Sequence, residues 1–106
     1  MNYNFKIHNP DFVRYLESQE RLDAGSAQQY DGCLKRLLNM YSIDELLTED
    51  IDKLARNYCA NNFSKATGEP LGKKALKNYR GTIKRFVAFS QYALAAEQNR
   101  AQPEAA

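Results

Sequence analysis

The longest amphipathic segment of the chain lies between Leu71 and Ala95. At 3.6 residues per turn its apolar side chains share one arc of a helix, which we expect to face the core; they are Leu76, Tyr79, Ile83, Phe86, Val87 and Leu94. Four cations fall within roughly 40° of a common line, about 120° from that arc; they are Lys73, Lys77, Arg80 and Lys84. The pattern predicts a long helix from about Lys73 to Ala95 that packs on one side and carries a basic stripe on another.

Three shorter apolar patterns precede this helix. The first predicts a helix from Pro10 to near Arg21, with Phe12 and Leu16 on its apolar face. A turn over 23–25 follows, and Ser26 then caps a second helix whose inner stripe includes Tyr30, Leu34, Leu37 and Tyr41. Thr48 caps a third helix that would bury Ile51, Leu54, Ala55 and Tyr58.

These patterns predict an all-α fold, a four-helix domain with a long C-terminal helix. We place the domain at residues 10–96, after a polar lead at 1–9 and before a flexible tail or linker at 97–106. A length of 106 residues suits one domain with a modest core. Gly32 falls in the middle of the second helix, at a cost of about 1 kcal/mol relative to Ala. That cost suggests close packing or close approach at this position.

Charge is distributed unevenly, although the net charge is only +2. Residues 44–52 carry five acids and no base, and helix capping with a favourable dipole explains such a cluster without catalysis. Residues 65–85 carry seven bases and one acid, Glu69. Regularly spaced Lys and Arg can neutralise successive phosphates, so a polyanion is the natural partner of the basic stripe. A solvated helix flank is the alternative interpretation.

The sequence lacks the residue patterns that several classes of function require. His8 is the only histidine, Cys33 and Cys59 have no metal-ligand spacing, and no glycine-rich phosphate loop is present. We therefore predict a non-enzymatic chain without cofactor or metal, whose two thiols stay unpaired. No apolar run approaches the length of a membrane span, which predicts a soluble, cytoplasmic protein without a membrane partner.

The order of these segments resembles a known DNA-binding domain. Residues 26–38 have a hydroxyl residue, Tyr30 four positions later, Leu34 four after that, and a large apolar residue at Leu37. This segment resembles the second helix of the core-binding (SAM-like) domain of phage integrases, the tyrosine recombinases. The segment from Ala75 to Phe89 resembles the fourth helix of that domain, and residues 12–16 resemble its first. The likeness covers roughly residues 10–95, and Ala75 departs from it where the family often has a hydroxyl residue.

In that family the domain forms half of a clamp around duplex DNA, with its second and fourth helices against the DNA. The resemblance implies a role in DNA integration or site-specific recombination, with partners that are double-stranded DNA and a C-terminal catalytic domain or other recombinase protomers. It implies DNA contacts from the following residues, to which the loop residue Lys65 is added for its charge: Ser26, Gln28, Gln29, Lys35, Arg36, Lys73, Lys74, Lys77, Asn78, Arg80, Gly81, Lys84 and Arg85.

The absence of the catalytic residues narrows this interpretation, and two other interpretations compete with it. The catalytic Arg, Lys, His and Tyr set of the recombinases is absent, so we expect the chain to bind DNA without cutting it. A helical module that binds a partner protein through Phe86, Phe89, Tyr92 and Leu94 is the rival hypothesis. A helix-turn-helix is disfavoured, because about nine residues separate the last two predicted helices where that motif needs three or four.

Overall fold

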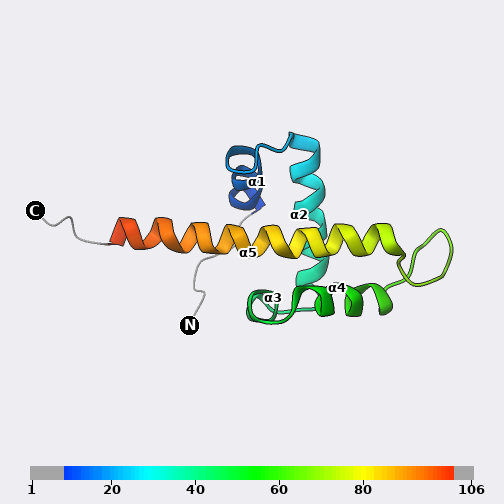
Figure 1. The fold of residues 1–106 in the computed structure, drawn as a ribbon. Helices are drawn as coiled ribbons and strands as arrows, with labels where there is room; N and C mark the ends of the chain where they lie inside the picture. The colour runs from blue at the N-terminus through cyan, green and yellow to red at the C-terminus, as the bar shows by residue number, and fades with distance from the viewer. Residues whose placement is uncertain (1–8, 102–106) are drawn as a thin grey trace, which may run out of the picture.

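A computed structural model describes the backbone of residues 9–101 and the side chains of residues 11–95 (Figure 1). Residues 1–8 of the predicted lead and residues 102–106 of the predicted tail lie outside the described residues. Five helices follow one another along the chain; they are α1 (Asn9–Ser18), α2 (Ala24–Leu38), α3 (Ile43–Thr48), α4 (Ile51–Ala60) and α5 (Lys73–Ala101). The described residues form no named strand, so the prediction of an all-α fold is confirmed.

The helix that the sequence did not predict is α3, because the apolar pattern did not separate it from its neighbours. Its first turn is a capping box, in which the Ser42 hydroxyl accepts from the Glu45 N–H and the Glu45 carboxylate accepts from the Ser42 N–H. Two orphan N–H groups are thereby satisfied, and a single buried residue, Leu46, anchors this short helix to the core. The predicted number of four helices was therefore wrong, because the described residues form five.

Both predicted helix caps were wrong, because an aspartate takes each role. The Asp23 carboxylate accepts from the Ser26 N–H at 2.7 Å, so α2 starts at Ala24 and the expected turn over 23–25 is its first turn. The Asp50 carboxylate accepts from the Lys53 N–H at 2.9 Å, whereas the Thr48 hydroxyl donates to the Asp44 carbonyl inside α3. A carboxylate at a helix N-terminus also interacts favourably with the helix dipole, which a hydroxyl does not.

The other helix ends also differ from the sequence-based bounds. α1 ends at Ser18, before the predicted Arg21, which adopts a left-handed backbone conformation with φ 56°. α2 ends at Leu38, so Tyr41 lies beyond it, although Tyr41 is buried as predicted. Its hydroxyl donates to the Leu54 carbonyl at 2.9 Å and links this turn to α4. α5 continues past the predicted end at Ala95 to Ala101.

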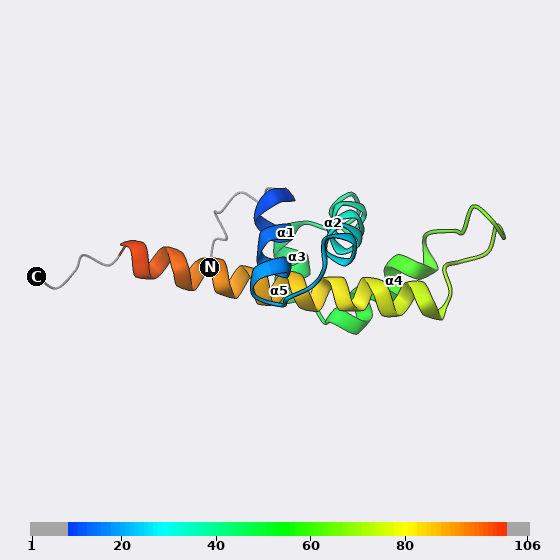
Figure 2. The same ribbon diagram turned by 90° about the horizontal axis from the view of Figure 1, so that it is seen from above.

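The long helix α5 is the spine on which the other four helices pack. Figure 1 shows α1 along one side of α5, α3 and α4 along the other, and α2 crossing between them. Seen from above, α2 lies on one side of α5 and the opposite side of α5 is left uncovered by α1 and α2 (Figure 2). The core between these helices is built from fully buried side chains, among them Phe12, Leu16, Leu37, Leu46, Ile83 and Phe86. Leu34 is also buried as predicted, and Tyr30 is half-buried.

Candidate nucleic-acid interface

The basic residues of α5 divide into two groups according to their surroundings. Residues 73–95 carry six cations and no acid. Four of these cations are exposed and form no ion pair with a described residue; they are Lys73, Lys74, Lys77 and Lys84. The other two, Arg80 and Arg85, are half-buried and pair with acids outside α5, Asp52 of α4 and Glu20 of the segment after α1. The free lysines are therefore the groups on α5 that can receive an external anion.

Arg80 faces α4 and does not continue the free basic stripe. Its guanidinium lies 3.2 Å from the Asp52 carboxylate, which also accepts a hydrogen bond from Arg56 one turn along α4. The hydrogen bond from Arg56 and the contact with Arg80 hold the pKa of Asp52 below its usual value. The charge of Arg80 is thus partly neutralised within the fold, although both side chains of the pair remain 43 % exposed.

Arg85 links α5 to α2 and to the segment that follows α1. Its Nε lies 3.0 Å from Glu20 Oε1, but the N–H is not aligned for a hydrogen bond, so the contact is an ion pair. Its guanidinium carbon lies 4.4 Å from the centre of the Tyr30 ring, within range of a cation–π interaction. These contacts tie α5 to the segment after α1 and to α2, and they leave Arg85 poorly placed to bind a phosphate.

Four of the five predicted contact residues on α2 are exposed but have different neighbours. Lys35 lies 3.4 Å from Asp31, a buried acid one turn earlier, and so neutralises a charge of the fold. Arg36 donates a hydrogen bond to the Tyr79 hydroxyl, which raises the pKa of Arg36 and keeps it cationic. Gln28 and Gln29 form no hydrogen bond with described side chains.

Arg36 contacts a pair of buried tyrosines through a hydrogen bond with Tyr79. The rings of Tyr58 from α4 and Tyr79 from α5 lie 4.4 Å apart, centre to centre. Burial raises the pKa of Tyr58, and its hydrogen bond with Tyr79 adds to the increase. The two buried tyrosines therefore orient Arg36, which remains exposed to solvent. Sequence reasoning missed this support, because nothing in the pattern indicates that Tyr58, Tyr79 and Arg36 converge.

The contacts of α2 with α5 show which flank of each helix lies at their crossing. Arg36 contacts Tyr79, whereas Tyr30, on the other side of α2, contacts Arg85 and lies near Gly81, further along α5. The flank of α2 that holds Arg36 therefore faces the N-terminal half of α5. At about 100° per residue this flank spans roughly 60° and also includes Gly25, Gln29 and Gly32.

The matching flank of α5 carries Lys74, Asn78 and Gly81, and Lys77 lies at its edge, roughly 60° from Lys74 and about 20° from Lys84. Figure 1 shows where α2 crosses the N-terminal half of α5, and the two flanks meet at this crossing. We refer to it as the α2–α5 corner, formed by Gln29, Gly32 and Arg36 of α2 and by Lys74, Lys77, Asn78 and Gly81 of α5. It combines three cations with two amides and contains no acid.

The remaining predicted contact residues lie outside this corner. Gln28 and Lys35 face away from α5, Lys73 lies on the side of α5 toward α4, and Lys84 lies on the side of α5 away from α2. Ser26 is half-buried in the first turn of α2, where its N–H binds Asp23. Lys65 is exposed in the loop before α5. The structure thus assembles about half of the predicted set into one surface and distributes the rest over other faces.

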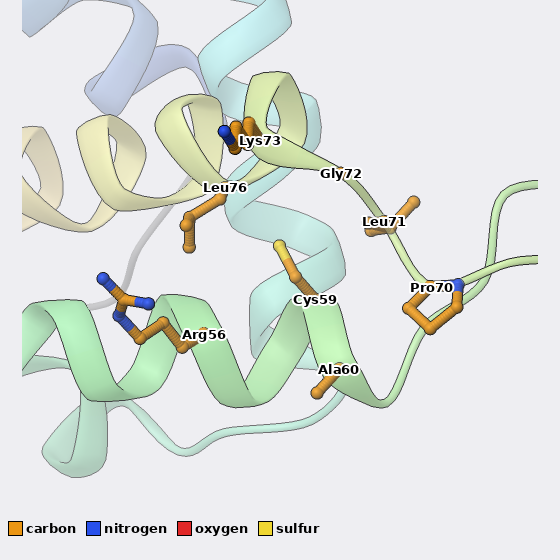
Figure 3. Close-up of a pocket in the computed structure, with 8 residues that line it drawn as sticks. All are labelled: Arg56, Cys59, Ala60, Pro70, Leu71, Gly72, Lys73 and Leu76. Carbon is orange, nitrogen blue, oxygen red and sulfur yellow. The ribbon is translucent and has the colours of Figure 1, made fainter.

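A pocket of 370 Å³ lies between α4 and the start of α5 (Figure 3). Cys59 and Leu76 extend toward each other across it, while Arg56 and Lys73 supply its cations. Burial raises the pKa of the Cys59 thiol, so the thiol is a wall of the pocket and not a nucleophile. No group of metal-ligating side chains occurs among the described residues.

The described helices include none with the length and apolar composition that a membrane span requires. Comparison of the chain with protein-family models, with curated proteins and with solved structures finds no match.

Proposed function

We propose that this chain binds duplex DNA through the α2–α5 corner, as the core-binding half of a recombinase-like clamp. The observation that carries the proposal is the division of charge on α5. The acids near α5 neutralise Arg80 and Arg85, and none of them pairs with Lys74 or Lys77. Unpaired cations on a folded helix flank attract phosphates, because their binding releases counterions from the DNA.

The chemistry of the corner suits both parts of DNA recognition. Arg36, Lys74 and Lys77 can pair with phosphates and so position the domain on the duplex. Gln29 and Asn78 present amides, which can donate to and accept from adenine in the major groove. Arg36 is oriented by Tyr79 before any ligand arrives, which lowers the entropic cost of binding for this long side chain.

A role in DNA integration or recombination remains part of the proposal through the resemblance described above. The matching partners are a C-terminal catalytic domain and other protomers on the same DNA. The rival hypothesis of a protein-binding surface has less support, because two of its four side chains, Phe86 and Phe89, are buried. Tyr92 is the exposed member of that set, at 48 %.

Titration of a labelled duplex at several salt concentrations tests the proposal. We expect Arg36→Ala, Lys74→Ala and Lys77→Ala each to flatten the plot of log affinity against log salt by about 0.9. The matched control is Lys53→Ala, since Lys53 is an exposed cation of α4 that faces away from α5. When the salt concentration rises from 50 to 200 mM, the affinity of a variant that lacks one phosphate contact should fall by a factor about 3.5 times smaller than the affinity of the original chain.

Thermal unfolding of each variant separates lost contacts from lost structure. Arg36→Lys provides a second control, because it keeps the positive charge at this position. It is used if Arg36→Ala destabilises the fold through the lost contact with Tyr79. Slopes equal to that of the original chain in all three corner variants would overturn the proposal. Salt-insensitive binding to a protein partner, with no duplex binding, would favour the rival hypothesis instead.

A further inference from the structure

The loop at residues 61–72 carries an exposed aromatic side chain beside exposed cations. Phe63 is 61 % exposed, which is more than the other exposed large apolar side chains of the described region, Met40 and Tyr92. A single exposed apolar residue is ordinary on a protein surface. Phe63 differs in its setting, because Lys65 follows in the same loop and Lys73 and Lys74 begin the helix after it. Glu69 is the only acid among residues 61–77.

The loop holds a defined shape through its backbone hydrogen bonds. Phe63 and Pro70 form an antiparallel bridge, and the Ser64 N–H donates to the Glu69 carbonyl at 2.8 Å. The Gly68 N–H returns to the Ser64 carbonyl, and Gly68 takes the left-handed conformation, with φ 72°, that this tight turn requires. Phe63 is therefore presented on a hairpin-like loop and does not fold back onto the core.

The base of this loop is attached to the body of the protein. The Leu71 N–H donates to the carbonyls of Cys59 and Asn62, and the Asn62 amide donates to the Tyr58 carbonyl. Figure 2 shows the loop rising on the same side of α5 as α2. The loop thus stands at the far end of the α2–α5 corner, and a rod-shaped ligand lying in that corner along α5 would reach it.

We propose that the 61–72 loop is a second DNA-contacting element, in which Phe63 packs against the deoxyribose and base edges of a groove while Lys65 pairs with a phosphate. This inference rests on the proposed function and adds to it an apolar contact outside both DNA-facing helices. Charge identifies the occupant, since the cations around Phe63 would oppose a basic partner and attract a polyanion. Apolar side chains placed against DNA grooves are a recurrent device of proteins that bind and shape duplexes.

The two residues of the loop should produce different experimental signatures. An apolar contact adds affinity without releasing counterions, whereas a phosphate contact changes the salt slope. With the full chain and a labelled duplex, we expect Phe63→Ala to weaken binding about fivefold at every salt concentration, with an unchanged slope. We expect Lys65→Ala to flatten the slope by about 0.9. Phe63→Leu should lose less affinity than Phe63→Ala.

Tyr92→Ala is the matched control, because Tyr92 is an exposed aromatic residue near the other end of α5. It should leave both affinity and slope unchanged. Thermal unfolding of Phe63→Ala should match that of the original chain, since an exposed side chain contributes little to the core. If Phe63→Ala binds as tightly as the original chain while Lys74→Ala and Lys77→Ala bind more weakly, the loop proposal is wrong and the proposed function stands. If the original chain shows no salt-dependent duplex binding, both are wrong.

Discussion

Gly32→Ala separates the stability of the fold from the proposed DNA contact in a single change. Gly32 lies in the interior of α2, where glycine is less favourable than alanine by about 0.8–1.0 kcal/mol. A methyl group at this position would meet no atom within 4 Å. The expectation of close packing at Gly32 is therefore not met within the described fold, and the expectation of close approach by a ligand stays a prediction.

The expected gain in stability follows from helix propensity alone. With no clash and no lost contact, the substitution should raise the free energy of unfolding by about 1 kcal/mol. For a domain of this size that corresponds to a rise of about 4–8 °C in the unfolding midpoint. Gly81→Ala is the crowded counterpart, because its methyl would lie 3.4 Å from the Arg85 guanidinium and 3.9 Å from the Tyr30 ring.

Thermal unfolding and duplex titration of the same variants provide the test. If the duplex backbone passes close to α2, Gly32→Ala should be more stable than the original chain and bind DNA more weakly. A variant that is more stable and binds DNA with unchanged affinity would show that no ligand approaches α2 at Gly32. A variant that is less stable would refute the reasoning at its first step, since it would require a packing contact at Gly32.

Three further predictions concern the core, the buried phenols and catalysis. Phe86→Ala should lower the free energy of unfolding by about 3–5 kcal/mol in chemical denaturation, because Phe86 is fully buried and packs edge-on against Phe12; a neutral result would contradict this account of the core. The pKa of Tyr58 is raised above its ordinary value of 10.0 in the folded state. Above pH 10.0 the unfolded state therefore loses a proton that the folded state retains. The contribution of Tyr58 to the free energy of unfolding is complete below pH 10.0 and falls as the pH rises above that value. Tyr58→Phe should make that alkaline fall shallower, as measured by denaturation between pH 8 and pH 11. Incubation with a nicked suicide duplex should yield no protein-linked strand in denaturing electrophoresis; a linked band abolished by one Tyr→Phe substitution would show that the chain is an enzyme.

The sequence by itself determined the helical class and most of the core. Leu34, Leu37, Ile83 and Phe86 repeat at helical spacing, and burial of an apolar stripe follows from that spacing whatever the helix packs against. It also indicated that α5 is rich in positive charge, since this helix carries no acid between residues 73 and 95 that could neutralise its lysines locally. It did not reveal α3 or the aspartate caps, because such boundaries depend on which nearby side chain reaches a free N–H first.

Only the tertiary structure decided which cations remain free. Asp52 and Arg80 are far apart in sequence, as are Glu20 and Arg85, and each pair forms because α5 packs beside the segment that carries the acid. The same packing brings Arg36 onto Tyr79 and turns Lys35 away from α5. Helical periodicity sets the direction of a side chain on its own helix, whereas its partner across the fold depends on how the helices cross. The basic stripe was therefore readable from the sequence, and its division into structural and exposed cations was not.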